Sequence, residues 1–296
     1  MTRRALAATL SQPRARLFAG SRVWRRFSSN YVAVASLFVL IAIIVLSILA
    51  PTLPLQDPDQ PNTAMRMAPP GTEGHLLGTD SLGRDLLSRI VWGGRVSLTA
   101  GIMASSLAML AGVLLGIVSG YVGGRLDAII MRTVDVIMAF PVILLAMAIV
   151  AALGPSLTNA MLAAAVAGIP LYARVARAQV LTLRELDFVL ASRAMGVPHM
   201  SVMLEHILPN ILTPLIVTYT LDIGNMIILT SSLSFLGLGA QPPTADWGNM
   251  IAAGRAHIRS VPHLVLIPGL AIFLVVLAFN LLGDGLRDAT DPRMEK

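Results

Sequence analysis

The chain has 296 residues, of which 55% are hydrophobic and only 13% charged, and its formal net charge is +6. Soluble domains carry about 25% charged residues, so this composition excludes an ordinary soluble protein and favours one that crosses a membrane repeatedly. The absence of cysteine excludes disulfides, thiolate metal sites, iron–sulfur clusters and cysteine nucleophiles. The positive charge is nearly all arginine without interleaved aromatic residues, which indicates contact with anionic lipid rather than nucleic acid.

The first apolar run covers residues 31–50 and follows an arginine-rich segment, residues 1–30. A cleaved signal peptide would have a shorter apolar core, and Pro51 stands where cleavage would need a tolerant residue. We therefore expect an uncleaved first span with the N-terminal segment in the cytoplasm. Residues 51–92, rich in Pro, Gly and Asp, then form an external loop. The loop glycines are expected at turns, at Gly71, Gly74, Gly78 and Gly83.

Further apolar runs are each close to the length that crosses the roughly 30 Å hydrocarbon layer. They predict five more spans, at residues 96–121, 134–153, 157–173, 211–236 and 264–282. Six spans return the chain to its starting side, so both termini are predicted in the cytoplasm. Most arginines then lie on the inner side, which supports this orientation. The predicted division is completed by a five-helix core at residues 93–290 and a cytoplasmic tail at residues 291–296.

Two sequence features concern packing and bending of the predicted spans. Small residues four apart recur on one face of the second and fourth spans, at Gly112, Gly116, Gly120, Ala160, Ala164 and Gly168. Such faces let another helix approach closely, and they carry no information about function. Prolines within or near the spans interrupt helical hydrogen bonding and can mark hinges, at Pro141, Pro170, Pro214 and Pro268.

Residues 185–210, between the fourth and fifth spans, form a polar-faced interruption between long apolar runs. Gly196 supplies a left-handed position that ends a first short helix, and Pro198 cannot continue that helix. A second short helix is expected to run toward Leu208 and to stop before Pro209. The segment is therefore predicted to form a helix–turn–helix unit outside the bilayer. A unit of this kind can lie in a groove of a soluble partner and transmit motion.

The motifs of common catalytic and metal chemistry are missing. A phosphate-binding loop needs a Gly-Lys-Ser/Thr ending, whereas the only lysine is Lys296. Any nucleotide hydrolysis is therefore expected on another chain. His199, Glu205 and His206 lack the His-Glu-x-x-His spacing and are expected to make polar surface contacts. No Gly-x-Ser-x-Gly nucleophile motif occurs, so the sequence predicts neither a catalytic residue nor a metal site.

Asp222 is an ionisable residue inside a predicted span, and Asn225 follows about one helical turn later. A charge within a span suggests a functional site, so both residues are candidates to line or support a translocation path. An alternative is a structural polar interface in which arginine or backbone groups contact Asp222. Near the inner boundary, Asp127, Arg132 and Asp135 are expected to form interfacial ion pairs.

The inner segment resembles a loop shared by the membrane subunits of binding-protein-dependent ABC importers, of the form Glu-Ala-Ala-x3-Gly-x9-Ile-x-Leu-Pro. Leu190 replaces the glutamate, Ser192 the second alanine and His206 the isoleucine, which weakens a role for the glutamate more than it weakens the resemblance. Three further stretches are similar to the dipeptide and oligopeptide permease "C" subunits of this family. They are residues 77–85, 239–248 and 279–288, and the resemblance covers about residues 70–293 with the first span in outline.

This resemblance implies an all-α permease with six transmembrane helices and with cytoplasmic coupling helices between spans four and five. It also implies the partners: a sister permease subunit, two ATPase subunits that hold ATP and Mg, an extracytoplasmic binding protein and membrane lipid. The chain itself would hold no cofactor and would lie in a bacterial inner membrane. The residues that the resemblance assigns to coupling are Leu190, Ala191, Ser192, Arg193, Gly196, His206, Leu208 and Pro209.

The predicted substrate is a peptide, with dipeptides favoured. Permeases for nickel chelates, glutathione, oligopeptides or D-alanyl-D-alanine stay open as alternatives, because selection resides mainly on the binding protein. Outside this class, an ion channel would need a filter or a charged ring. A proton-driven transporter would need a relay of several intramembrane acids, and Asp222 by itself does not form such a relay. A membrane enzyme would need clustered catalytic groups at one depth, and none is visible.

Overall fold

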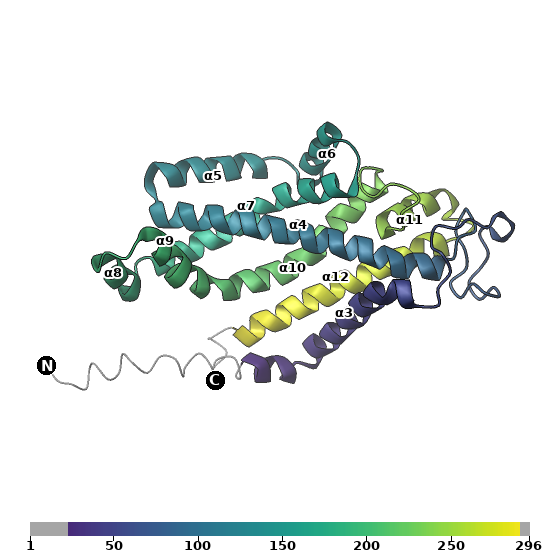
Figure 1. The fold of residues 1–296 in the computed structure, drawn as a ribbon, viewed down its shortest axis with the longest axis horizontal. Helices are drawn as coiled ribbons and strands as arrows, with labels where there is room; N and C mark the ends of the chain where they lie inside the picture. The colour runs from purple at the N-terminus through teal and green to yellow at the C-terminus, as the bar shows by residue number, and fades with distance from the viewer. Residues whose placement is uncertain (1–22, 291–296) are drawn as a thin grey trace.

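The computed structural model describes residues 23–290, and these residues form a long bundle of α-helices without a β-strand. The first long helix, α3 (Tyr31–Leu49), is capped by Asn30, whose side chain accepts hydrogen bonds from the backbone N–H groups of Val32 and Ala33. It packs along α12 (His263–Thr290) at one side of the bundle (Figure 1).

The central helix pair is α4 (Leu86–Val122) and α7 (Leu157–Leu183), which pack along much of their length. Glycine permits this approach: a Cβ at Gly112 would lie 2.6 Å from the Ile169 carbonyl oxygen, and one at Gly116 would lie 2.5 Å from the Ala173 oxygen. The predicted small-residue face of the second span is thus confirmed as a helix contact. The next long helix, α10 (Leu208–Phe235), packs against α4, α7 and α12.

The predicted third span is bent rather than continuous. The chain forms α5 (Gly124–Met138) and α6 (Val142–Leu153), which meet at 93°. Pro141 stands at the break and precedes α6. Proline disfavours helical backbone in the preceding residue and cannot donate a helical hydrogen bond, so the first helix ends there. The other prolines of the spans lie inside α7, α10 and α12 without ending them, at Pro170, Pro214 and Pro268.

Two helices extend beyond the predicted spans. α4 begins at Leu86 rather than near residue 96, because the side chain of Asp85 caps it and accepts a hydrogen bond from the Ser88 N–H at 2.7 Å. α7 continues past the predicted end at residue 173 to Leu183. Its added turns carry arginines, which a hydrophobicity pattern does not count as membrane-spanning.

The connecting segments gather at the two ends of the bundle (Figure 1). One end, called the outer end below, carries the loop that precedes α4 and the loop between α10 and α12. Its short helices are η1 (Ala50–Thr52), η2 (Thr63–Met65), α11 (Trp247–Gly254) and η4 (Arg255–His257). The opposite end, called the inner end below, carries α8 (Asp187–Ala194), α9 (His199–Ser201) and η3 (Val202–Ile207), a π-helical stretch.

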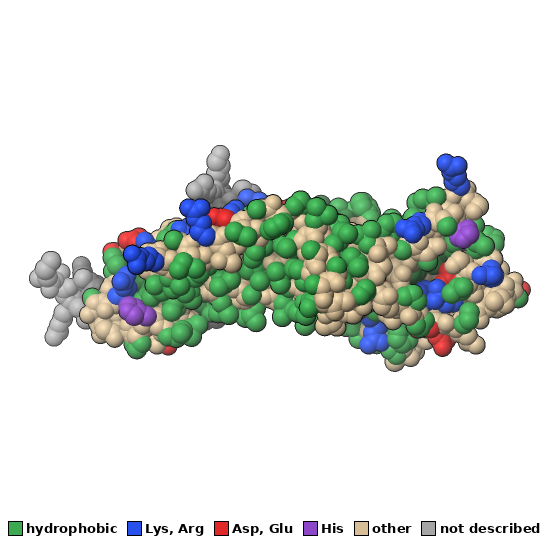
Figure 2. All heavy atoms as spheres, turned by 90° about the horizontal axis from the view of Figure 1, so that it is seen from above, with side chains coloured by type: hydrophobic (Ala, Val, Ile, Leu, Met, Phe, Trp, Pro, Cys, Tyr) green, Lys and Arg blue, Asp and Glu red, His purple; other side chains and the backbone are tan. Residues whose placement is uncertain are grey.

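Within the described residues, five helices are long and apolar enough to cross a membrane, or six if the bent α5–α6 pair counts as one span. Figure 2 shows arginines gathered toward the two ends, with apolar side chains over the middle. The predicted all-α membrane fold is confirmed. The start of the described chain and the end of α12 both lie in the half of the bundle nearer the inner end (Figure 1). The arginine-rich residues 1–22 and the tail 291–296 lie outside the described residues.

Candidate functional site

The α8–η3 segment, residues 187–207, consists of two helical arms joined at Gly196. Gly196 has a φ of +79°, and its N–H donates to the Arg193 oxygen at 3.0 Å. The Val197 N–H donates to the Ser192 oxygen at 3.1 Å, which closes the turn. The predicted left-handed turn between two short helices is therefore confirmed.

The second arm does not stop before Pro209, and this prediction was wrong. α9 passes through η3 directly into α10, so the chain is helical from His199 to Phe235. Pro209 lies in the first turn of α10, where a missing N–H is tolerated, and the wider π-helical turn before it gives the ring room. The second arm of the α8–η3 segment is consequently continuous with α10, whereas α8 joins it through the turn at Gly196.

The two faces of the α8–η3 segment differ in burial. Val189, Val202 and Ile207 are fully buried in a core shared with α4, α7 and α10. Six large apolar side chains of the segment and of its N-cap residue are exposed, a set called the outward apolar face below: Leu186, Phe188, Leu190, Met195, Met200 and Leu204. Clustered exposed apolar side chains beyond the apolar middle of a membrane protein are typical of a surface that contacts another protein.

Tyr121, at the inner end of α4, anchors the segment to the bundle. Its hydroxyl forms a hydrogen bond with Nδ1 of His199 at 2.8 Å. The guanidinium of Arg193 lies over its ring, 5.8 Å from the centroid. Tyr121 was not predicted as a site residue, although an aromatic residue at the end of a predicted span is a recognisable anchor signal.

A polar cluster supports the same end of the bundle. Asp127 accepts hydrogen bonds from Nε and Nη2 of Arg177 at 2.6 and 2.7 Å, and another from the Ser119 hydroxyl. Nη1 of Arg184 donates to the Gly120 oxygen at 2.9 Å, which joins the end of α7 to the end of α4. The expected ion pairing of Asp127 is confirmed, and its partner comes from α7.

Of the two other residues expected in ion pairs near the inner boundary, one forms an ion pair within the described residues and the other does not. Asp135 pairs with Arg174 at 2.6 Å, and both side chains are about half exposed. Arg132, the third residue of that expectation, is in none of the ion pairs found among the described residues.

The residues assigned to coupling do not share one surface. Ser192 is buried, and its hydroxyl donates to the Phe188 oxygen at 2.8 Å. His206 and Leu208 are partly buried. The exposed members of the set are Leu190, Ala191, Arg193, Gly196 and Pro209. Only part of the set is therefore available for direct contact with a partner.

Asp222 and Asn225 lie on α10 in different surroundings. Asp222 is 3% exposed, and its Oδ2 accepts hydrogen bonds from the hydroxyls of Ser105 and Tyr172, both at 2.8 Å. These two hydroxyls lie 2.7 Å from each other. The carboxylate thus joins α4, α7 and α10 in the interior of the bundle, whereas Asn225 is exposed. The partners of Asp222 are hydroxyls rather than the arginine or backbone groups considered from sequence.

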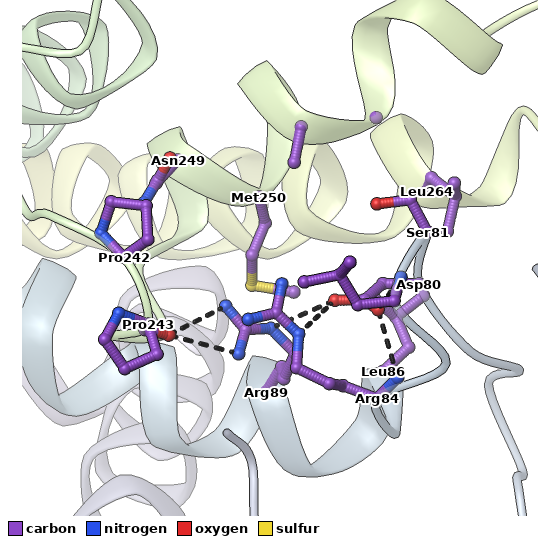
Figure 3. Close-up of a pocket in the computed structure, with 13 residues that line it drawn as sticks. Asp80, Ser81, Arg84, Leu86, Arg89, Pro242, Pro243, Asn249, Met250 and Leu264 are labelled. Atoms are coloured by element: carbon purple, nitrogen blue, oxygen red, sulfur yellow. Dashed lines mark hydrogen bonds and ion pairs between the residues drawn. The ribbon is translucent and has the colours of Figure 1, made fainter. Parts of the chain in front are cut away.

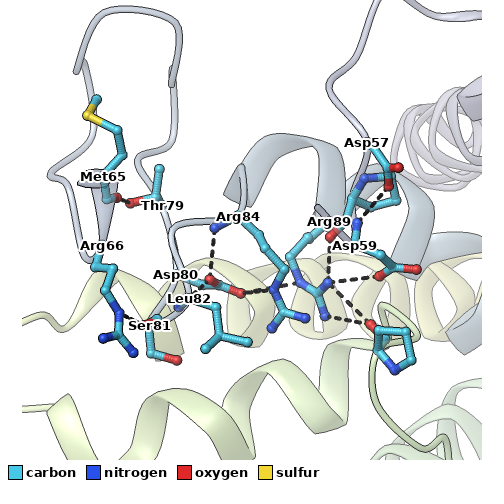
Figure 4. A network of polar contacts seen from close by, with 12 residues as sticks. Asp57, Asp59, Met65, Arg66, Thr79, Asp80, Ser81, Leu82, Arg84 and Arg89 are labelled. Carbon is cyan, nitrogen blue, oxygen red and sulfur yellow. Dashed lines mark hydrogen bonds and ion pairs between the residues drawn. The ribbon is translucent and has the colours of Figure 1, made fainter. Parts of the chain in front are cut away.

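The motif at residues 77–85 builds the outer start of α4 (Figure 4). Oδ1 of Asp80 accepts hydrogen bonds from the N–H groups of Leu82 and Arg84 at 2.8 and 3.0 Å, and its Oδ2 accepts one from Nε of Arg84 at 2.7 Å. Gly83 has a φ of +79°, and a Cβ there would overlap the Asn62 oxygen at 1.7 Å. The loop glycines expected at turns all have positive φ, which confirms that expectation.

Arg89, in the first turn of α4, contacts both outer loops. Its Nη1 donates to the Pro58 oxygen at 2.6 Å and to Oδ1 of Asp59 at 3.2 Å. Both terminal nitrogens also reach the Pro243 oxygen at 3.4 Å (Figure 4). The two outer loops therefore meet at one buried guanidinium, a role that the sequence pattern did not indicate.

The fold defines a polytopic all-α membrane protein of the permease class. A family model described as "Binding-protein-dependent transport system inner membrane component" matches residues 112–296, and the chain belongs to this family. A second model, the N-terminal TM domain of oligopeptide transport permease C, matches residues 19–70. The chain is accordingly a permease component of an ABC transport system, as its sequence motifs predicted, and not its catalytic subunit.

Curated relatives cover nearly the whole chain. A dipeptide transport system permease protein from Alkalihalophilus pseudofirmus is 44% identical over 272 residues, which is 92% of this chain and 89% of that protein. A glutathione transport system permease protein from Pectobacterium atrosepticum is also 44% identical, over 92% of this chain and 90% of the relative. An inward-facing structure of the MetNI methionine ABC transporter has a TM-score of 0.55 at 18% identity, over 70% of this chain and 98% of that chain, which shows a shared fold.

Proposed function

We propose that this chain is one of two permease subunits of an ATP-driven importer of peptides, with dipeptides as the favoured substrate. The observation that carries this proposal is the 44% identity over 92% of the chain to a dipeptide permease. The equally similar glutathione permease keeps glutathione as the alternative substrate. Glutathione is itself a small peptide, so both relatives favour the same chemical class.

The α8–η3 segment is the proposed contact with an ATPase subunit. Its outward apolar face is available for a groove of that partner, while its inner face is buried against the bundle. ATP and Mg would be held by the ATPase subunits. Because η3 continues into α10, a displacement of the segment would move α10 directly. Nucleotide binding would then bias a rigid-body change between two arrangements of the bundle.

Asn225 and Asp222 are proposed to serve the translocation path in different ways. Asn225 is exposed on α10 and can face a path shared with the sister subunit. Asp222 is buried behind it and would support the path by holding α4, α7 and α10 together. The two residues would thus belong to one site without sharing one surface.

The proposed orientation places the α8–η3 end in the cytoplasm of a bacterium, and with it both chain termini. The outer end, with residues 51–92 and α11, would then face the extracytoplasmic binding protein. This assignment keeps the predicted division into an N-terminal segment at 1–30, a first span at 31–50, a permease core at 93–290 and a short tail at 291–296. It is supported by the distribution of arginine.

Reconstitution tests the transport function. The chain, its sister permease, two ATPase subunits and the binding protein are placed in proteoliposomes, and uptake of a labelled dipeptide, glutathione and a nickel chelate is compared. We expect ATP-dependent uptake of the dipeptide and no ATP hydrolysis by the purified chain alone. Preferred uptake of the nickel chelate, or ATP turnover by the isolated chain, would contradict the proposal.

Crosslinking tests the coupling surface, since the chain contains no native cysteine. A cysteine at Met200 or Leu204, both on the outward apolar face, should crosslink to an ATPase subunit in the assembled complex. A cysteine at Thr182, which is exposed on α7 just before the segment, serves as the control. Equal crosslinking from all three positions would argue against a specific contact.

A further inference from the structure

A cavity of about 230 Å³ lies at the outer end, between the start of α4, the helix α11 and the start of α12 (Figure 3). Asp80, Arg84 and Arg89 form a charged part of its wall. Much of the remaining wall is apolar, and its larger members are Leu82, Leu86, Pro242, Pro243, Met250 and Leu264. The cavity therefore offers a charged and an apolar region side by side.

The two arginines keep hydrogen-bond donors free at this cavity. Arg84 is 8% exposed and Arg89 is 3% exposed. Among the described residues, Arg84 uses only its Nε, which donates to Asp80, so its two terminal nitrogens have no protein acceptor. Nε of Arg89 is buried without a hydrogen-bond partner, because Oδ2 of Asp80 lies 3.6 Å away. Figure 3 shows the two guanidinium groups side by side, between Asp80 and Pro243.

The charge on the cavity wall is not balanced. Asp80 is its only carboxylate, against two guanidinium groups. Asp59 reaches Arg89 from outside the cavity, and its side chain is 41% exposed, so solvent screens it. Buried charges that lack full compensation are costly, and a planar guanidinium matches a carboxylate in geometry. A carboxylate between Arg84 and Arg89 would supply the missing acceptors and the missing negative charge.

We propose that this cavity binds the C-terminal residue of a peptide, with its carboxylate between Arg84 and Arg89 and its side chain against the apolar wall. A peptide end presents these two features next to each other, which the mixed wall accommodates. The proposal rests on the proposed peptide substrate, and it places a substrate contact at the outer end of the permease. The proposal also assigns a role to the motif at residues 77–85, because Asp80 in this motif orients Arg84 toward the cavity.

A matched pair of small probes tests the site on the assembled complex in nanodiscs without binding protein. N-acetylphenylalanine carries the carboxylate, and N-acetylphenylalaninamide has the same shape without the charge. Binding is measured by ligand-observed saturation-transfer NMR and by titration. We expect the acid to bind at least about tenfold more tightly than the amide, because only the acid offers charged acceptors to both arginines. Equal affinities of the acid and the amide would overturn the proposal.

Two variants locate the binding. Ala253→Phe fills the cavity without removing a polar group, since Ala253 lines the cavity and is itself exposed. Ala256→Phe is the control, because Ala256 is exposed on the neighbouring η4 and does not line the cavity. Ala253→Phe should abolish binding of the acid, and Ala256→Phe should retain it. Arg84→Gln should weaken binding about tenfold, and Ala253→Phe keeps the test decisive if that variant does not assemble.

The outcomes separate this site from other sources of a carboxylate and from the transport function. If Ala253→Phe leaves acid binding unchanged but weakens docking of the binding protein, the cavity receives a side chain of that partner and the proposal fails. If wild-type proteoliposomes import dipeptides while the two probes bind equally, the cavity assignment falls and the peptide importer stands. If no peptide is imported, the proposed function falls, and the peptide assignment of the cavity falls with it even where the acid still binds.

Discussion

At the scale of single residues, the buried carboxylate of Asp222 joins three helices. It accepts two hydrogen bonds at 2.8 Å, from Ser105 on α4 and Tyr172 on α7. A buried acceptor that is lost leaves its donors without a partner in a region that excludes water. Asp222 therefore contributes to the contact of α4, α7 and α10, whatever part it has in the path.

Replacing Asp222 distinguishes a supporting role from direct contact with substrate. Asp222→Leu leaves at least one of the two buried hydroxyls without an acceptor, which costs about 1–3 kcal/mol, so we expect less assembled complex and a lower melting temperature. Asp222→Asn keeps an oxygen acceptor and should cost less. Uptake per assembled complex is measured alongside. Normal assembly of Asp222→Asn with strongly reduced uptake per complex would instead place the charge in the path.

At the scale of helices, small residues decide the contact between α4 and α7. A Cβ at Gly116 would lie 2.5 Å from the Ala173 oxygen and 2.7 Å from the Ala176 Cβ. Backbone atoms cannot rotate away as a flexible side chain does, so the two helices would have to separate. The pair packs through backbone proximity, as small-residue helix faces in membranes do.

A glycine-to-alanine comparison tests this contact. Gly116→Ala should destabilise the complex by about 1–3 kcal/mol through overpacking. Gly269→Ala is the control, because Gly269 lies inside α12 with no atom within 4 Å of the added Cβ. The control should be neutral or should stabilise by up to about 1 kcal/mol through helix propensity. Thermal stability of both variants is measured in the same detergent, and equal losses would refute the packing account.

The turn of the α8–η3 segment provides a second test at this scale. No atom lies within 4 Å of a Cβ added at Gly196, so a substitution there is penalised by the backbone conformation alone, by about 1 kcal/mol. We expect Gly196→Trp to reduce uptake and substrate-stimulated ATPase activity while much of the complex still assembles. Ala194→Trp, exposed on α8, controls for bulk. Equal defects in the two variants would assign the effect to bulk on the surface.

At the scale of the whole molecule, the apolar middle and the two arginine-bearing ends define how the bundle can lie in a membrane (Figure 2). The α8–η3 segment lies at one end and α11 lies at the other (Figure 1). A membrane therefore separates these two elements. The excess of arginine toward the inner end favours the cytoplasm for the α8–η3 segment.

Single cysteines test this orientation without background, since the chain has none of its own. Thr63 and Thr244 are exposed at the outer end, and Met200 is exposed at the inner end. An impermeant maleimide is added to cells whose outer membrane has been permeabilised. It should label cysteines introduced in place of Thr63 and Thr244 but not a cysteine introduced in place of Met200. Permeabilising the inner membrane should make Met200 reactive. If only the cysteine at position 200 is labelled before that step, the proposed orientation is wrong and the opposite one holds.

Local properties of the sequence determined the class and much of the outline of this protein. The spans follow from apolar runs, because burying a helix in lipid requires about 20 apolar residues whatever surrounds them. The turn at Gly196 follows from one glycine and a nearby proline, and the structure has the expected positive φ there. The transport family followed from short motifs in a fixed order. The coupling role of individual residues stays a prediction, since burial alone does not show which of them a partner contacts.

Only the tertiary structure decided which polar groups meet. The helix ends before Pro141, where the chain bends, but it continues through Pro214, and a hydropathy pattern treats both prolines alike. Ser105, Tyr172 and Asp222 come together from three helices, and Arg89 contacts the Pro243 oxygen across 154 positions of the chain. Such contacts depend on how whole helices pack and which loops reach one another. A sequence pattern describes residues that are close along the chain, whereas a buried charge is stabilised by groups that are close in space and can be far apart in sequence.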